Sequence, residues 1–159
     1  MGCARLQPEL VLPSVPPAVW MDQVSYDGFQ LTGRILIEGR SNTFVDRRLN
    51  DETIALTRVR TCSDEAALPV AHVDYLWKAR DPTDVITLRP SEFFGKEESF
   101  LLFTQEVDPQ GGPDCIRFTL NWAHPGMEGG QRVWLSTFEG KAVRSVGNAA
   151  GAARPAGSE

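Results

Sequence analysis

The sequence predicts an all-β protein: a two-layer antiparallel β-sandwich of about eight strands, either immunoglobulin-like or transthyretin-like. Apolar and polar residues alternate with a period of two in segment after segment between Val19 and Phe138, as in strands that bury one face. Turn-forming residues separate these segments at intervals of about eight to twelve residues, which is typical of sandwiches. No segment shows a convincing long helical period.

The chain has 159 residues, of which 42% are hydrophobic, which is the size of a single domain with a substantial core. We expect an extended Pro-rich spacer at residues 1–17, the β-sandwich at residues 18–141 and a disordered tail at residues 142–159. Three prolines between Leu10 and Pro17 disfavour ladder hydrogen bonds. The tail is rich in Ala, Gly, Arg and Ser and has no apolar period.

The first two strands are predicted at residues 19–26 and 29–39, joined by a hairpin turn at Asp27-Gly28. Asp-Gly between two alternating segments is a strong hairpin signal, since both central residues of a type I′ turn have positive φ. Gly33 interrupts the inner apolar row of the second strand and is a candidate β-bulge. That inner row is Phe29, Leu31, Ile35 and Ile37, with Leu36 the one apolar residue on the other face.

The remaining strands follow a polar loop at residues 41–51. A single helical turn capped by Ser91 is predicted within residues 90–98. The segment after it is apolar on both faces, as in a strand buried between layers. The six further strands are predicted at residues 52–62, 68–79, 84–90, 99–107, 114–122 and 131–138.

Cys62 and Cys115 are predicted to form a disulfide, because they are an even pair once Cys3 is set aside. Such a bridge favours an oxidising compartment, whereas two buried free thiols are the alternative. Cys115 is out of phase with the inward row Ile116, Phe118 and Leu120. The bridge is therefore expected at a sheet edge or at strand ends.

Gly2-Cys3, followed by the Pro-rich spacer, resembles the start of a mature bacterial lipoprotein. The resemblance implies a lipid on Cys3 and a place in the periplasm or at the cell surface. Myristoylation of Gly2 with palmitoylation of Cys3 is an alternative, although its pattern asks for Ser or Thr where this chain has Leu6. An ordinary chain start, with a cytoplasmic location, is the third interpretation.

The charge of the chain, −5 overall, argues against nucleic acid as a partner, because phosphate-binding faces need clustered Lys and Arg. Arg47-Arg48 is the longest basic cluster in the sequence. No apolar run approaches the roughly 20 residues of a membrane span. We therefore expect membrane contact only through a lipid anchor at Cys3.

No catalytic residue, metal site or cofactor is predicted. His72 lies two residues from Asp74 on one side of a predicted strand, but no nucleophile elbow accompanies the pair. His124 has no partner at metal-ligand spacing. Paired carboxylates in loops lack the alternating spacing of calcium loops, so we interpret them as a solvated surface.

Aromatic residues are the most informative candidates for binding. In the last strand Val133 and Leu135 form one row, and Trp134, Ser136 and Phe138 form the other. If the aliphatic row faces the core, Trp134 and Phe138 share the exposed face, where aromatics mark protein interfaces or sugar-stacking platforms.

The sequence thus indicates a non-enzymatic, exported binding module, whose partner is another protein or an envelope component. The lipoprotein resemblance adds a lipid tether at Cys3. The alternative is a carbohydrate-binding module that binds polysaccharide through the exposed aromatics. Residues 31–48 and 129–141 resemble starch- and glycogen-binding domains, but the aromatic-Asp-Asn-Asn signature of that family is absent. No residue role is carried over from that family.

Overall fold

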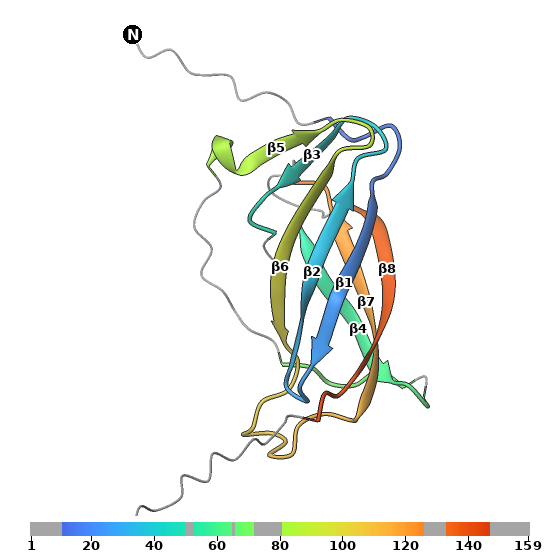
Figure 1. The fold of residues 1–159 in the computed structure, drawn as a ribbon, viewed down its shortest axis with the longest axis vertical. Helices are drawn as coiled ribbons and strands as arrows, with labels where there is room; N and C mark the ends of the chain where they lie inside the picture. The colour runs from blue at the N-terminus through green and yellow to red at the C-terminus, as the bar shows by residue number, and fades with distance from the viewer. Residues whose placement is uncertain (1–10, 50–52, 65, 72–80, 126–132, 147–159) are drawn as a thin grey trace, which may run out of the picture.

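The computed structural model describes residues 11–49, 53–64, 66–71, 81–125 and 133–146. Within them the chain forms eight β-strands and one short 3-10 turn, without an α-helix. The two larger sheets face each other as two layers, and a small third sheet lies across one end (Figure 1). The prediction of an all-β, antiparallel, sandwich-like protein is confirmed.

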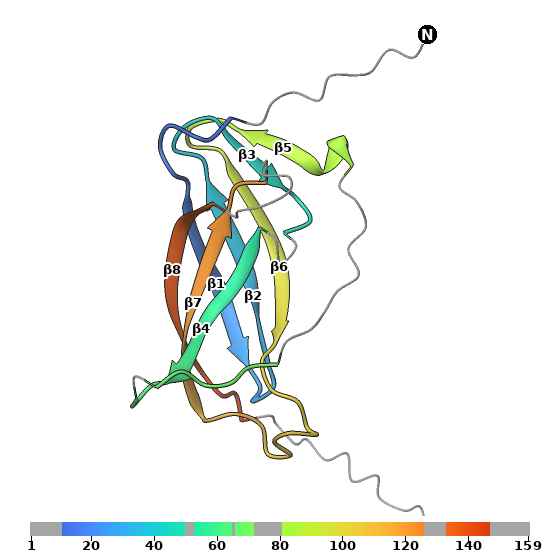
Figure 2. The same ribbon diagram turned by 180° about the vertical axis from the view of Figure 1, so that it is seen from behind.

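Each larger sheet has three antiparallel strands. The order in the first sheet is β1-β2-β6 and in the second β4-β7-β8, while β3 pairs with β5 (Figure 2). The first sheet comprises β1 (Ala18–Tyr26), β2 (Gln30–Glu38) and β6 (Phe93–Leu101). The second comprises β4 (Ile54–Thr61), β7 (Cys115–Ala123) and β8 (Trp134–Val143). The small sheet comprises β3 (Thr43–Asp46) and β5 (Val85–Leu88), the latter preceded by the 3-10 turn Pro82–Asp84.

The core lies between the inner faces of the two larger sheets. Both central strands, β2 and β7, alternate buried and less buried residues along their length. The predicted inward rows are confirmed for these strands, whereas Phe29 precedes β2 and is half-buried. Full burial of each such side chain is worth about 1.5–3 kcal/mol. The central buried residues are Leu31, Ile35 and Ile37 from β2 and Ile116, Phe118, Leu120 and Trp122 from β7.

The β1–β2 hairpin forms where Asp27-Gly28 predicts it, but the turn is of another kind. Gly28 has a φ of 101°, whereas Asp27 is not among the residues with positive φ, so the type I′ prediction is wrong. The Asp27 carboxylate instead accepts hydrogen bonds from the backbone N–H groups of Phe29 and Gln30, both at 2.7 Å. This Asx-type turn needs left-handed backbone at the glycine alone.

Gly33 marks a β-bulge, as its place in the sequence indicates. The register shifts between Asp22 and Ser25, so that Gln23 and Val24 of β1 lie opposite Gly33 of β2. Gln23 has a φ of 50°, which is the local distortion that an extra residue in one strand requires.

Three further segments differ from expectation. No helical turn follows Ser91, whose φ is 69°. Strand β6 starts at Phe93 and ends at Leu101, so it begins and ends earlier than the strand predicted at residues 99–107. The predicted polar loop at residues 41–51 contains β3. The predicted strand at residues 68–79 falls mostly outside the described residues, and its described part belongs to none of the eight strands.

The predicted boundaries of the domain also shift. Strand β8 continues to Val143, inside the segment expected to be a disordered tail. At the other end, the described part of the Pro-rich spacer is docked on the sandwich without forming a strand. Val15 exchanges hydrogen bonds with the Ser41 hydroxyl at 3.1 and 2.9 Å, and the Pro17 carbonyl accepts one from Ser136.

Cys62 and Cys115 form the predicted disulfide, with 5.5 Å between their Cα atoms. It joins the end of β4 to the start of β7, and the Cys62 N–H also donates to the Cys115 carbonyl at 3.2 Å. The bridge thus lies at strand ends and closes a loop with a sequence separation of 53 residues.

Replacing both Cys62 and Cys115 by Ala should lower the free energy of unfolding by about 2–4 kcal/mol, since the bridge restricts the unfolded chain. Urea denaturation measures the loss, and Cys3→Ser is the control that leaves the bridge intact. If both thiols are alkylated in the native, oxidised protein, the bridge does not exist in solution.

Gly140→Ala should cost about 1–3 kcal/mol, because a Cβ there overlaps the buried ring of Phe118. Gly95→Ala is the matched control: its Cβ lies 3.0 Å from the mobile end of Leu36, and its effect should stay within about 0.5 kcal/mol. Denaturation midpoints compare the two variants, and equal losses would contradict the packing at Gly140.

Candidate functional site

Trp134 and Phe138, the predicted binding pair, lie in different environments. Trp134 is 37% exposed at the start of β8. Phe138 is half-buried, opposite Leu120, and its ring packs edge-to-face against Phe118 at 6.3 Å. The predicted shared outer face is therefore wrong for Phe138, and only Trp134 remains as an exposed aromatic of this strand.

The physical reason is a register shift in the β7–β8 ladder. Trp122 pairs with Ser136, whereas the next residue, Ala123, pairs with Trp134, so β8 contains one extra residue at Leu135. A bulge of one residue reverses the face on which later side chains point. Strict alternation along the sequence therefore assigned Phe138 to the wrong face.

Of the other candidates from the sequence, the structure describes His124. His124 is buried, contacts Phe44 edge-to-face, and its Nε2 lies 3.1 Å from the Val11 carbonyl. Its role in the described residues is to hold the N-terminal segment on the sandwich. Cys3, His72, Asp74 and Trp77 lie outside the described residues. Across the described ranges, no group of three or more His, Cys, Asp or Glu is arranged to hold a metal ion.

An aromatic patch, made of Trp20, Leu36 and Phe93, lies on the outer face of the β1-β2-β6 sheet. Val19 and Met21 are buried on the inner side of β1, so Trp20 between them points outward. Leu36 lies directly opposite Trp20 in the ladder. The ring of Phe93, which is 58% exposed, meets the ring of Trp20 edge-to-face at 6.1 Å and 86°.

Gly95 makes this arrangement possible. It is the β6 partner of Leu36, and it brings no side chain to the outer face. The Leu36 side chain occupies that space, since its Cδ2 would be only 3.0 Å from a Cβ at position 95. Trp20 and Phe93 therefore meet across the middle strand, although β1 and β6 are not neighbours.

Charged residues border the aromatic patch on the same face. The next row of the sheet is Asp22, Arg34 and Glu97, directly opposite one another, and Glu38 lies beside Phe93 in the last row. Arg34 donates two hydrogen bonds to the Asp22 carboxylate, at 2.9 and 2.7 Å. The border thus holds three carboxylates and one guanidinium and is acidic overall.

The Asp22–Arg34 pair stabilises the ionised form of both side chains. The hydrogen bond from Arg34, and secondarily its charge, lowers the pKa of Asp22. The hydrogen bond to Asp22, and then the charge of Asp22, raises the pKa of Arg34, with a smaller contribution from Glu97. A bidentate pair of this kind has defined geometry, so it forms a fixed polar edge to the patch.

The aromatic patch left one signal in the sequence, the outward Leu36 in an otherwise alternating strand. Phe93 was not recognised as a strand residue because a helical turn was predicted there. The contact between Trp20 and Phe93 joins strands that are far apart in the chain.

The described residues include no helix long and apolar enough to cross a membrane.

Fold and site together define the class: an antiparallel β-sandwich with a partly exposed aromatic patch on the outer face of one sheet. Comparison of the chain with protein-family models, with curated proteins and with solved structures gave no match. Function is therefore inferred from the site itself.

Trp134→Ala should change the free energy of unfolding by less than about 1 kcal/mol, because Trp134 is exposed. Phe138→Ala should cost at least about 2 kcal/mol, because it removes the contact with Phe118 and leaves a cavity. Urea denaturation of the two variants shows which of the two side chains is exposed and which packs against the core. A loss below about 1 kcal/mol in both variants would restore the shared outer face that the sequence predicts.

Proposed function

We propose that this chain is a non-enzymatic, exported β-sandwich module that binds another protein through the aromatic patch Trp20, Leu36 and Phe93. The observation that carries the proposal is the Trp20–Phe93 pair on the outer face of a sheet, in which Phe93 is exposed and Trp20 is half-buried, bordered by the hydrogen-bonded Asp22–Arg34 pair. Isolated exposed apolar residues are ordinary, but a contiguous apolar group with a polar border marks an interaction surface.

The size of the patch suits an anchor within a protein interface. Aromatic side chains bury up to about 150–250 Å² each, and the parts of Phe93 and Trp20 that are still exposed supply a fraction of the roughly 800 Å² that each partner contributes to a standard interface. Binding energy usually concentrates in a few such residues, surrounded by polar contacts that exclude water.

The charges specify the chemistry of the partner. The border of the patch is acidic, with Asp22, Glu38 and Glu97 against Arg34. A complementary surface would place an apolar side chain over the Trp20–Phe93 pair and Lys or Arg around it. The partner is therefore a protein surface with an apolar centre and a basic rim.

The alternative carbohydrate function has less support. Sugar stacking uses flat aromatic faces, and the Trp20 and Phe93 rings are nearly perpendicular, so they do not form one continuous platform. The other aromatic pair considered for this role is divided between the surface and the core.

Export is supported by the Cys62–Cys115 disulfide, since such bridges persist mainly in oxidising compartments. A lipid anchor on Cys3 remains part of the proposal. Mass spectrometry of the protein from its native membranes would detect it as the added mass of the acyl chains.

A photo-crosslinking amino acid at position 97, beside the patch, should capture the partner, while the same group at Val143, on the other sheet, should not. The captured protein is then purified and titrated. Phe93→Ala should weaken its binding at least about tenfold, with stability changed by less than about 1 kcal/mol. Val143→Ala, also an exposed apolar truncation, should bind like the wild type.

The same titration at increasing salt tests the charges. Glu97→Gln should weaken binding and flatten the salt dependence if the partner has a basic rim. Wild-type affinity in the Phe93→Ala variant would overturn the proposal. So would a crosslink between two copies of this chain, or binding of an oligosaccharide that Phe93→Ala abolishes.

A further inference from the structure

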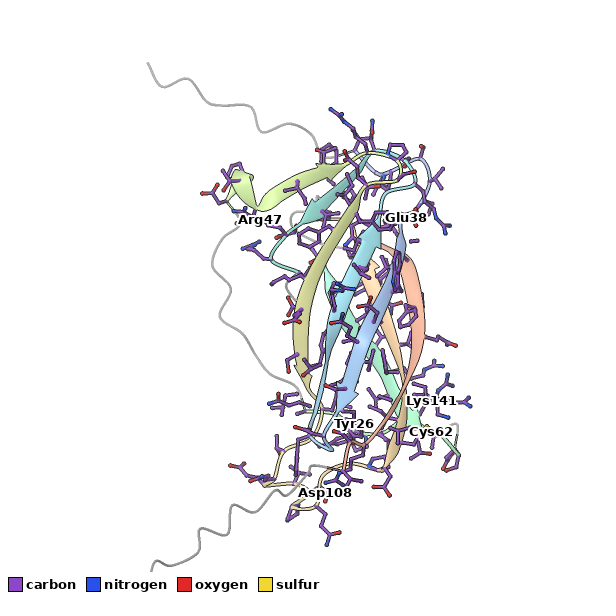
Figure 3. All side chains as sticks on the ribbon, in the orientation of Figure 1. Tyr26, Glu38, Arg47, Cys62, Asp108 and Lys141 are labelled. Carbon is purple, nitrogen blue, oxygen red and sulfur yellow. A yellow bond between two sulfur atoms is a disulfide. The ribbon has the colours of Figure 1, made fainter. Side chains whose placement is uncertain are left out.

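A row of three cations crosses the outer face of the second sheet. Arg60 of β4 lies directly opposite Arg117 of β7, and Arg117 lies directly opposite Lys141 of β8. Their neighbours Val59 and Phe118 are buried on the inner face, so the three basic side chains point outward. Figure 3 shows Lys141 at the same end of the sandwich as Cys62.

The local charge opposes that of the whole chain. The outward charged residues of these three strands are Arg58, Arg60, Arg117, Glu139 and Lys141, which is four cations against one carboxylate. Glu139 lies 3.7 Å from Arg60, measured from Oε1 to Nη2. Among the outward charged residues of the three described strands the cations outnumber the carboxylates, in a chain whose net charge is −5.

This row works against the stability of the sheet. Neighbouring strands lie about 4.8 Å apart, and like charges directly opposite each other are destabilising. Two successive cross-strand pairs of cations therefore repel each other, and a bound anion would remove that repulsion. Solubility does not require such a row, since the rest of the chain is acidic.

The disulfide fixes the spacing of the two arginines. Cys62 follows Arg60 by two residues on β4, and Cys115 precedes Arg117 by two on β7. In a strand, residues two apart point to the same face, so the covalent bridge lies one row from the guanidinium groups. Holding two ligand-binding groups at a set distance reduces the entropy lost on binding.

The cations border a hollow. A surface depression of about 270 Å³ is lined by Arg60, Arg117, Lys141 and Glu139, together with Phe118 and Gly140. That is smaller than the roughly 300–1,000 Å³ of sites for drug-sized ligands, but it is ample for one tetrahedral anion. Guanidinium groups bind such oxyanions with two parallel hydrogen bonds, and an ammonium adds a point charge.

We propose that Arg60, Arg117 and Lys141 form an oxyanion site on the outer face of the β4-β7-β8 sheet, which takes a phosphate or sulfate group of a ligand. Three cations in one row match a doubly charged tetrahedral group better than a carboxylate, for which one arginine suffices. Arg117 and Lys141 are exposed, and the Arg60 side chain, paired with Glu139, is 14% exposed. The site lies on the opposite layer from the aromatic patch (Figure 2), so the two proposals stand or fall separately.

Titration of the oxidised protein with inorganic phosphate and with sulfate, followed by NMR, tests the site. Sodium acetate and sodium chloride at equal ionic strength are the reference titrations. Saturable shifts should concentrate at Arg60, Arg117 and Lys141, with a dissociation constant in the millimolar range or tighter. Equal shifts with chloride would mean charge screening only and would overturn the proposal.

Arg117→Gln should weaken phosphate binding at least tenfold, and Lys141→Gln should weaken it less. Arg40→Gln, the same change at an exposed position beyond the end of β2, should bind like the wild type, as should Phe93→Ala. At low salt and without ligand, Arg117→Gln should melt at the same temperature as the wild type or higher, since it relieves repulsion. Unchanged phosphate affinity in Arg117→Gln, or a clear loss of stability at low salt, would contradict the argument.

The source of the group is distinguished by vesicles. Wild-type binding to phosphatidylglycerol vesicles but not to phosphatidylcholine vesicles, lost in Arg117→Gln, would identify a phospholipid headgroup. Binding of inorganic phosphate without vesicle binding would identify a small phosphate or sulfate ester. Binding of neither would overturn the site while leaving the protein-binding proposal untouched.

Discussion

The packing of the two inner faces against each other is the constraint on which the rest of the structure depends. Ile35 and Ile37 of β2 and Phe118 and Trp122 of β7 are fully or almost fully buried, and each belongs to the middle strand of its sheet. Once these rows face inward, the period of two sends every intervening side chain to the outside. Core packing therefore decides which side chains form the two outer faces, where both proposed sites lie.

The same constraint explains why the two outer faces differ so strongly. No apolar layer covers them in the described residues, so their composition is free of core requirements. One face joins an aromatic patch to a mainly acidic border, while the other carries a row of cations. Solvation alone requires neither the Trp20–Phe93 pair on an outer face nor three like charges in one row. An apolar patch on the surface lowers solubility, and like charges opposite each other lower the stability of the sheet. Each feature is therefore interpreted as a binding site.

Single residues interrupt the alternation of inward and outward side chains at three points. The bulge opposite Gly33 and the extra residue at Leu135 each change the phase of a strand, and the second moved Phe138 from the predicted outer face to the core. The positive φ of Ser91 starts a strand where a helical cap was expected. In each case a single residue changes the outcome. The interrupted apolar row at Gly33 indicated the first, whereas the alternation around Leu135 and Ser91 does not record the other two.

The sequence by itself determined the all-β class, most strands, the inward rows of β2 and β7, the first hairpin and the pairing of Cys62 with Cys115. These depend on period, on turn residues and on a count of cysteines, which are local or nearly local properties. Only the tertiary structure decided that Trp20 meets Phe93 and that Arg60, Arg117 and Lys141 form a row. The physical reason is that strand order and register bring together residues that are distant in the chain. Two arginines and a lysine, scattered through an acidic sequence, become one site only when three strands align.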